Sequence, residues 1–279
     1  MLIAGDRLEV WGDPIAHSLS PRLHTAAYRT LGLEWAYGRR QVSAASFPGE
    51  FGALGPSYRG LSLTMPLKGR AFDAAVSRNR HGELSGAVNT LLLADDGPHG
   101  FNTDVAGIAA DVAEQLDAPI DRARIVGSGA TATSALLALE TLGVSRVEVA
   151  ARRPEAVERL ARLGAQIGVT VEGVGLDTRA RDVVALTVAT LPGGAPFDPA
   201  VADALARDGG LLYDVVYGHW PTELAVAWER HGARAVAGIG MLVHQALRQV
   251  RVFVSGSDEN VLPDEPAVLA AMWDAVTEV

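Results

Sequence analysis

Short apolar runs alternate along this chain with stretches in which apolar residues recur every three or four positions. The first pattern is typical of buried strands and the second of amphipathic helices, so their succession predicts an α/β fold. In the first part of the chain, we expect strands over residues 8–12, 35–41, 60–64 and 87–93, and helices over 21–31, 67–77 and 105–116.

The succession becomes more regular after about residue 120. Strand–helix–strand repetition there predicts a doubly wound parallel sheet. The expected strands cover 124–126, 146–151, 169–171, 183–188 and 211–215, the helices 131–142 and 154–163, and two long amphipathic helices 241–254 and 265–279 follow. We therefore expect an N-terminal α/β domain over 1–104 with a mostly parallel sheet, and a C-terminal Rossmann-type domain over 105–239. The closing helices, 240–279, are expected to pack back on the first domain.

A glycine-rich turn joins the strand at 124–126 to the next helix. Its sequence, G-S-G-A-T-A over 127–132, matches the G-x-G-x-x-A pattern of dinucleotide-binding turns, and a second strand follows. The first glycine permits a tight turn, and the second lets the backbone approach a pyrophosphate at the helix N-terminus. The alternative is a turn that only joins two elements. The pattern favours cofactor binding by Gly127, Ser128, Gly129, Ala130 and Thr131.

The end of the next strand indicates which dinucleotide is bound. NAD sites usually place an acidic residue there, to bond the ribose 2′-hydroxyl. This chain has Arg152 and Arg153 instead, and guanidinium groups suit a 2′-phosphate. The alternative is a pair of solvated arginines on a loop. We expect NADP rather than NAD as the cofactor.

Lysine is used only once in the chain. Arginine supplies 23 of the 24 basic residues, and Lys68 is the other. Arginine does not release its proton in proteins, whereas a lysine amine can. Lys68 falls in the first turn of an expected helix, where a cation opposes the helix dipole. This placement favours a functional lysine over one that remains by chance.

Polar side chains gather near the ends of expected strands in the first half. Ser18 and Ser20 lie two apart, so both hydroxyls face one way in an extended segment. Ser20 and Pro21 are also typical of a helix start, with serine as the N-cap. Asp104 begins a helix, where a carboxylate is favoured on structural grounds alone. Together with Lys68 it would form an acid–base pair suited to the proton of an alcohol.

Composition excludes several other classes of function. The net charge is −9, which argues against nucleic-acid binding. The chain has no cysteine and no H-E-x-x-H spacing, so no metal site is expected. No uncharged stretch is long enough to span a bilayer and the N-terminus is no signal peptide, so we expect a cytoplasmic protein without a membrane partner.

The motifs, in this order, resemble those of the shikimate dehydrogenase family nearly from end to end. They are S-x-S-P-x-x-H at 18–24, T-x-P-x-K at 64–68, A-V-N-T at 87–90, N-T-D at 102–104, the glycine turn, D-V-V-Y at 214–217 with P-T at 221–222, and G-I-G-M-L-V-H-Q at 238–245. The resemblance implies NADPH-dependent, reversible reduction of 3-dehydroshikimate to shikimate, in aromatic amino-acid biosynthesis.

The resemblance also implies a role for each matching residue. Lys68 and Asp104 would be the catalytic pair. The substrate would be held by Ser18 and Ser20 at its carboxylate, by Thr64, Asn89 and Gln245 at its hydroxyls, and by Tyr217 beside it. Thr190, Gly238 and Met241 would join the glycine turn and the arginine pair in binding the cofactor. The chain departs from the family pattern at Ser62, where asparagine is frequent, and at Ala151-Arg152-Arg153, where N-R-T is usual.

Three alternatives remain open at this point. A quinate or mixed quinate/shikimate dehydrogenase and a paralogue acting on an amino-shikimate share these motifs. A regulatory protein that senses NADPH would be expected to lack the amine or the carboxylate, and both are present. We expect a small molecule as the partner, and a monomer or homodimer.

Overall fold

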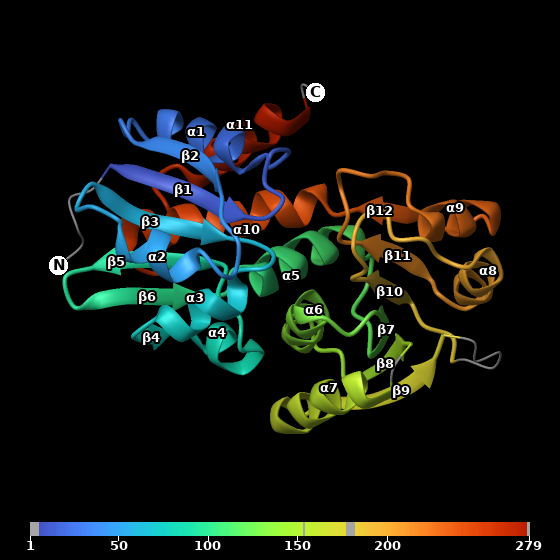
Figure 1. The fold of residues 1–279 in the computed structure, drawn as a ribbon. Coiled ribbons are helices and arrows are strands. Elements are labelled where there is room, and N and C mark those ends of the chain that lie inside the picture. Colours follow the sequence, from blue (N-terminus) through green and yellow to red (C-terminus); the bar gives the residue numbers. More distant parts are fainter. Residues whose placement is uncertain (1–5, 153, 177–181, 278–279) are drawn as a thin grey trace. The chain divides into compact units, whose positions relative to one another are not determined.

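The computed structural model describes residues 6–152, 154–176 and 182–277. The chain divides into two compact units, one of residues 1–107 and 243–279 and the other of residues 108–242. Each unit is built on its own six-stranded sheet with helices packed against it (Figure 1). The predicted α/β class is confirmed.

The sheet of the first unit is mixed. Its strands run in the order β2-β1-β3-β5-β6-β4. The pairs β1–β2, β1–β3 and β4–β6 are parallel, while β3–β5 and β5–β6 are antiparallel. The strands are β1 (Arg7–Gly12), β2 (Ala36–Gln41), β3 (Tyr58–Leu63), β4 (Ser77–Arg78), β5 (Thr90–Ala94) and β6 (Gly97–Phe101).

Five helices lie early in the chain and two close it. They are α1 (Ser20–Thr30), α2 (Phe47–Gly52), α3 (Lys68–Ala74), α4 (Arg80–Ser85), α5 (Asp104–Gln115), α10 (Ile239–Ser255) and α11 (Glu265–Thr277). The expected serine N-cap of α1 is wrong. Leu19 holds that position, Ser20 is the first helical residue, and no side chain in the described part of the chain caps the helix.

The two faces of β3 receive different partners. Leu61 and Leu63 belong to the apolar cluster that also contains Phe47 of α2 and Ala71 of α3. The alternate positions face the other way, because successive side chains in a strand point to opposite sides. A Cβ on Gly60 would lie 2.5 Å from the Phe253 ring of α10. Glycine at this position therefore lets α10 lie close to the sheet.

The second unit has a parallel sheet in the order β12-β11-β10-β7-β8-β9. This is the Rossmann order, with the topological switch between β7 and β10. The strands are β7 (Arg122–Val126), β8 (Arg146–Ala151), β9 (Thr170–Gly175), β10 (Leu186–Ala189), β11 (Leu211–Asp214) and β12 (Ala235–Ala237), and the helices are α6 (Ala130–Thr141), α7 (Pro154–Ile167), α8 (Pro199–Arg207) and α9 (Glu223–Arg230).

A histidine is buried in the first unit without a charged partner. The ring of His24, on α1, is fully buried and stacks on Tyr37 with the ring centroids 4.0 Å apart. Its Nδ1 lies 3.1 Å from the Tyr28 hydroxyl and its Nε2 lies 3.1 Å from Oε1 of Gln249. Burial lowers the pKa of His24 to about 3, so the folded protein keeps this ring neutral.

This burial predicts a loss of stability in acid. The unfolded chain protonates His24 below its ordinary pKa of 6.5, whereas the folded chain does so only near pH 3. The stabilising contribution is therefore complete above pH 6.5 and declines as the pH falls, by about 1.4 kcal/mol per pH unit. Urea unfolding between pH 7 and pH 4 should show a shallower pH dependence for His24→Gln than for wild type. His17→Gln, at an exposed position, should keep the wild-type slope. Equal slopes for His24→Gln and wild type would contradict the prediction.

Candidate active site

The first unit brings Lys68 and Asp104 into an ion pair. Lys68 begins α3 and Asp104 begins α5, and the two residues are 36 positions apart in the chain. The Lys68 Nζ donates to Oδ2 of Asp104 over 2.5 Å. The lysine side chain is 19% exposed and the aspartate side chain 6% exposed, so the pair is largely buried but can be reached from solvent on the lysine side. The second carboxylate oxygen, Oδ1, accepts from Nδ2 of Asn89 over 2.8 Å.

The side-chain amide of Asn89 is fixed in one orientation. Its Oδ1 accepts from the backbone N–H of Thr103 over 2.9 Å. Because a backbone N–H can only donate, Oδ1 must face Thr103, and the NH₂ group must face Asp104. The Thr90 hydroxyl also donates to Oδ1, and Nδ2 also donates to the Thr103 hydroxyl. Asn89 was expected to bind a substrate hydroxyl, and in the structure its amide orients the Asp104 carboxylate.

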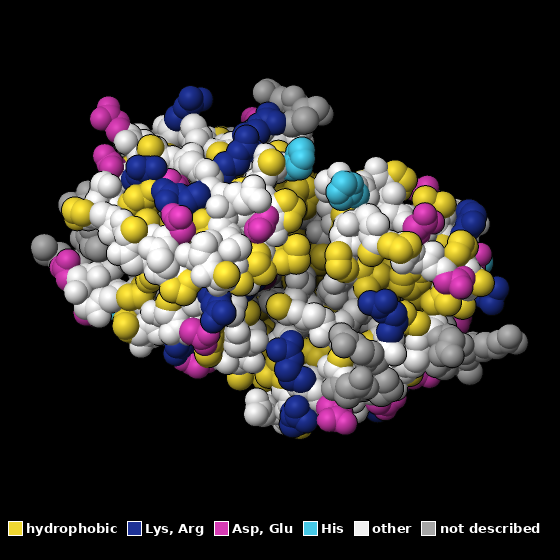
Figure 2. Space-filling model, in the orientation of Figure 1, with side chains coloured by type: hydrophobic (Ala, Val, Ile, Leu, Met, Phe, Trp, Pro, Cys, Tyr) yellow, Lys and Arg dark blue, Asp and Glu magenta, His cyan; other side chains and the backbone are white. Residues whose placement is uncertain are grey.

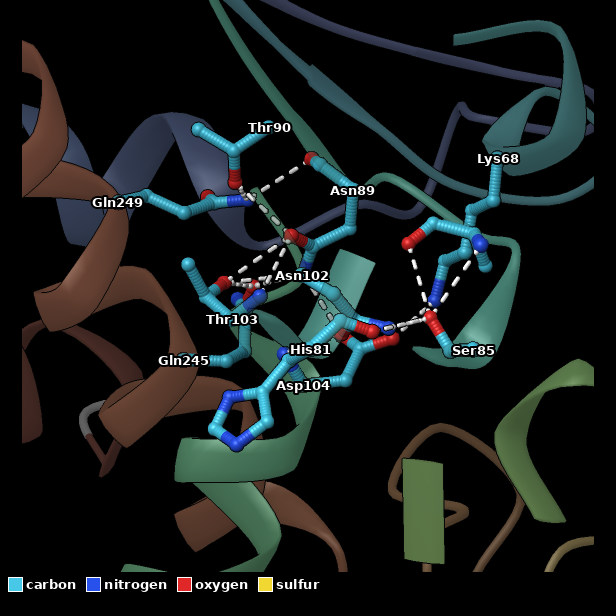
Figure 3. Close-up of polar contacts among 11 residues, drawn as sticks. Lys68, His81, Ser85, Asn89, Thr90, Asn102, Thr103, Asp104, Gln245 and Gln249 are labelled. Carbon is cyan, nitrogen blue, oxygen red and sulfur yellow. Dashed lines mark hydrogen bonds and ion pairs between the residues drawn. The ribbon is translucent and has the colours of Figure 1, made fainter. Parts of the chain in front are cut away.

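Gln245 lies beside this group (Figure 3). It extends from α10, and its Oε1 lies 3.4 Å from Nδ2 of Asn89 and 3.5 Å from the Thr103 hydroxyl. Thr64 follows β3 directly and is half-buried. The structure thus gathers Lys68, Asn89, Asp104 and Gln245 into one polar cluster of the first unit.

Ser18 and Ser20 lie at the start of α1. The Ser18 hydroxyl accepts from the backbone N–H of Ser20 over 3.3 Å, and Ser20 is buried while Ser18 is half-buried. Among the described residues, no hydrogen bond joins either serine to Lys68 or Asp104. Their expected contact with a carboxylate stays a prediction.

Asn102 supports the cluster, although no role was expected for this residue from the sequence. Its Oδ1 accepts from the backbone N–H of Asp104 over 3.1 Å, and its Nδ2 donates to the Ser85 hydroxyl over 2.9 Å. An asparagine two residues before a helix N–H is a common capping pattern. Asn102 therefore fixes the first turn of α5, and with it the backbone of Asp104.

The two glycines of the turn in the second unit differ in backbone conformation and in surroundings. Gly127 has a φ of +115°, and a Cβ there would lie 2.5 Å from the Thr190 hydroxyl. Gly129 is the N-cap of α6; among the described residues no side chain caps that helix, and a Cβ on Gly129 would meet none of their atoms within 4 Å. The backbone N–H groups of Ala130 and Thr131 thus begin a helix whose first turn has open space beside it. A diphosphate fits such a site, because the helix N-terminus offers donors and a favourable dipole.

The other expected cofactor residues belong to the same unit. Ser128 is half-buried in the turn, and Arg152 is exposed directly after β8. Arg153 lies outside the described residues. The hydroxyl of Thr190 donates to the carbonyl of Val126 over 3.1 Å, which ties the loop after β10 to the glycine turn.

A buried tyrosine holds the segment that contains Gly238 and Met241. The Tyr213 hydroxyl, on β11, donates to the Asp111 carboxylate of α5 and accepts from the backbone N–H of Met241. Burial and the neighbouring Asp111 charge raise the pKa of Tyr213 far above its ordinary value. A Cβ on Gly238 would lie 2.4 Å from the carbonyl oxygen of Val215, so only glycine fits. Tyr217, in the loop after β11, is 36% exposed, and its place beside a substrate stays a prediction.

Features of other functional classes are not found in the described part of the chain. None of its helices is long and apolar enough to cross a membrane. Its histidine, aspartate and glutamate residues form no group of three able to hold a metal ion. Figure 2 shows basic side chains scattered among acidic ones on the displayed face, rather than joined in the continuous basic surface that follows a nucleic-acid backbone.

Comparisons with known proteins point to one enzyme family. A family model of the shikimate dehydrogenase substrate binding domain matches residues 10–91. The shikimate dehydrogenase (NADP(+)) of Cupriavidus pinatubonensis is 34% identical, over 95% of this chain and 95% of its own length, and that of Cupriavidus necator is 36% identical, over 97% and 94%.

Solved structures show the same likeness. The crystal structure of Mycobacterium tuberculosis shikimate dehydrogenase superposes with a TM-score of 0.84 at 36% identity, covering 96% of this chain and 99% of that chain. Shikimate 5-dehydrogenase from Thermus thermophilus, in complex with NADP(H) and shikimate, gives a TM-score of 0.79 at 26% identity, covering 97% and 99%. The chain belongs to the shikimate dehydrogenase family.

Proposed function

We propose that this protein catalyses the reversible, NADPH-dependent reduction of 3-dehydroshikimate to shikimate. The Lys68–Asp104 ion pair carries this proposal, because it supplies a proton donor of the kind that reduction of a ketone requires. Relatives that match nearly the whole chain are named shikimate dehydrogenase (NADP(+)), and one structural neighbour holds both NADP(H) and shikimate. Both reacting groups of the pair are present, unlike the expected signature of a protein that only senses NADPH.

Lys68 supplies the proton in the direction of reduction. Bound NADPH supplies the hydride that the carbonyl carbon receives. As negative charge develops on the carbonyl oxygen, the ammonium group of Lys68 donates a proton to it, and a hydroxyl results. Asp104 aims the ammonium group, since one of its oxygens accepts from Nζ and the other is held by Asn89. In oxidation the pair takes the hydroxyl proton back.

The remaining side chains of the first unit orient the substrate in this proposal. Ser18 and Ser20 hold the carboxylate through their hydroxyls. Thr64 and Gln245 bind ring hydroxyls, and Asn89 shares its amide between the substrate and Asp104. Tyr217 adds a further contact to the substrate. Because the polar cluster is already hydrogen-bonded, little rearrangement is needed when the substrate arrives.

The second unit binds the cofactor in this proposal. The pyrophosphate lies against the turn from Gly127 to Thr131, where α6 presents free N–H groups and Gly129 leaves room. Arg152 and Arg153 bind the 2′-phosphate that distinguishes NADP from NAD. Gly238 and Met241 line the nicotinamide pocket, and Thr190 lies near the cofactor.

A panel of two substrates and two cofactors tests the proposed function. Purified protein should reduce NADP with shikimate, and it should be much slower with NAD and with quinate. Arg152→Ala should raise the KM for NADP far more than the KM for shikimate, because it removes a cation at the expected 2′-phosphate. Equal rates with quinate and with shikimate would indicate a mixed quinate/shikimate dehydrogenase. A preference for NAD would refute the prediction that Arg152 and Arg153 favour NADP.

Lys68 should be required as a proton donor and not only as a charge. Lys68→Ala should lower kcat by about 10²-fold or more, the usual range for a general acid. Lys68→Arg keeps a cation that cannot release its proton, so its kcat should be lowered as well. Steady-state rates at saturating shikimate and NADP measure both variants. An unchanged kcat in Lys68→Ala would remove the residue from the mechanism.

Alanine substitutions at the two glycines of the turn should have different effects. Gly127→Ala forces a Cβ into a positive φ and against Thr190, so it should destabilise the fold by about 1–3 kcal/mol. Gly129→Ala has an allowed φ of −81° and open space, so its thermal unfolding should match wild type while its KM for NADP rises. Calorimetry and steady-state kinetics separate the two effects. A Gly129→Ala protein with unchanged KM for NADP would place the cofactor elsewhere.

A further inference from the structure

Helix α10 presents a row of side chains to one face of β3. Gln245, Gln249 and Phe253 are spaced four apart, so they lie on one side of the helix. Gly60 and Ser62 are spaced two apart on the strand face that meets Phe253. Four helical residues rise about 6 Å and two strand residues about 6.6 Å, so the two rows stay nearly in step. Gln249, only 2% exposed, thus meets Ser62 one turn away from Gln245.

Gln249 joins two strands of the sheet. Ser62 of β3 and Thr90 of β5 are directly opposite each other in the antiparallel pair. The Ser62 hydroxyl donates to Oε1 of Gln249 over 2.8 Å, and Nε2 of Gln249 donates to the Thr90 hydroxyl over 3.0 Å. Nε2 also donates to the backbone carbonyl of Asn89 over 3.1 Å. A carbonyl only accepts, so this bond fixes the amide with Nε2 toward Asn89 and Oε1 toward Ser62.

The orientation of the Gln249 amide also determines which ring nitrogen of His24 carries the proton. Its Nε2 lies 3.1 Å from Oε1 of Gln249, which can only accept, so Nε2 carries the hydrogen and Nδ1 accepts from the Tyr28 hydroxyl. Every donor and acceptor position of the Gln249 amide is therefore used. A fully satisfied buried amide of this kind favours a single arrangement.

The hydrogen bonds continue in one direction from Gln249 to the ion pair. Thr90 receives a hydrogen bond from Gln249 and donates its own to Oδ1 of Asn89 over 2.9 Å. Asn89 then donates from Nδ2 to Oδ1 of Asp104. Figure 3 shows these side chains side by side, from Gln249 through Thr90 and Asn89 to Asp104. Loss of the Gln249 amide would leave the Thr90 hydroxyl and the Asn89 carbonyl buried with one partner fewer.

We infer that Gln249 is a positioning residue of the active site, which orients Asn89 and, through it, the carboxylate that aims Lys68. Gln249 itself touches neither member of the ion pair in this assignment. The kinetic effect expected of Gln249 rests on the proposed function, whereas its effect on the orientation of the Asn89 amide does not.

The kinetic test compares two changes on α10. Gln249→Leu keeps the volume and removes all hydrogen bonds of the amide, so it should lower kcat on the order of 10-fold to 10²-fold, as expected of a misaimed catalytic group. Its KM for NADP should not change, and its solvent deuterium isotope effect on kcat should increase, since proton transfer becomes slower. Phe253→Leu loses packing against the same sheet face but no side-chain hydrogen bond, so it should lower the melting temperature and leave kcat and the isotope effect unchanged. If Gln249→Leu behaves as Phe253→Leu does, the inference is wrong.

A second variant covers the case in which Gln249→Leu does not fold. Thr90→Val has nearly the same shape and removes only the hydroxyl between Gln249 and Asn89. It should reproduce the lower kcat and the larger isotope effect. Wild-type values for both quantities would overturn the inference.

An independent test observes Asn89 directly. The chain has four asparagines, so selective ¹⁵N-asparagine labelling gives four side-chain amide signals, and Asn89→Asp identifies the one from Asn89. This signal should shift and exchange faster with solvent in Gln249→Leu and Thr90→Val, but not in Phe253→Leu. An unchanged Asn89 signal would refute the inference whether or not the wild-type protein reduces dehydroshikimate. Wild-type protein inactive on shikimate, but with the shifted signal in the variants, would refute only the proposed function.

Discussion

The two oxygens of the Asp104 carboxylate accept from different donors, and the whole polar cluster depends on this division. Lys68 donates to one oxygen and Asn89 to the other. Lys68 begins α3, where the helix dipole disfavours a cation by up to about 1 kcal/mol. Asp104 begins α5, where the dipole favours its negative charge. A hydrogen-bonded and largely buried ion pair outweighs a dipole effect of this size, so the aspartate can hold the lysine at a helix end that would otherwise favour an acid.

The fold assembles this pair from segments that meet only in the folded sheet. Asn89 directly precedes β5, and Asp104 follows β6 by way of the Asn102 cap. Because β5 and β6 form an antiparallel hairpin, the residue before the first strand lies beside those after the second. The antiparallel part of the sheet thus explains why an amide and a carboxylate from two different motifs share one hydrogen bond.

The sequence predicted the long, strongly patterned elements and missed several of the shorter ones. β8 was predicted with its observed bounds, and α5 and α6 to within one residue at either end. Helix α2 was missed because six residues containing a proline and two glycines carry too little periodicity. Strand β6 reads G-P-H-G-F, which lacks the β-branched residues that identify a strand, and its pairing with β5 and β4 makes it one.

The same limit of prediction from sequence applies to the candidate site. Lys68 could be singled out because it is the one lysine in an arginine-rich chain, and the glycine turn because its spacing has a steric cause. Gln249 could not be singled out, because the pattern of an amphipathic helix does not distinguish a buried glutamine from a solvated one. The signal available in the sequence was its spacing of four residues from Gln245. The partner of Gln249 on the strand, Ser62 of β3, is brought to it only by the tertiary structure.

The matched rows of α10 and β3 restrict how this part of the gene can change in length. Deleting one residue between Gln245 and Gln249 would rotate every later side chain of the helix by about 100°, and deleting one residue of β3 before Ser62 would move Ser62 to the other face of the strand. Either event would separate Ser62 from Gln249 at once, whereas substitutions alter one contact at a time. This segment should therefore diverge among descendants of the chain through replacement of residues, with insertions and deletions confined to the loops on either side.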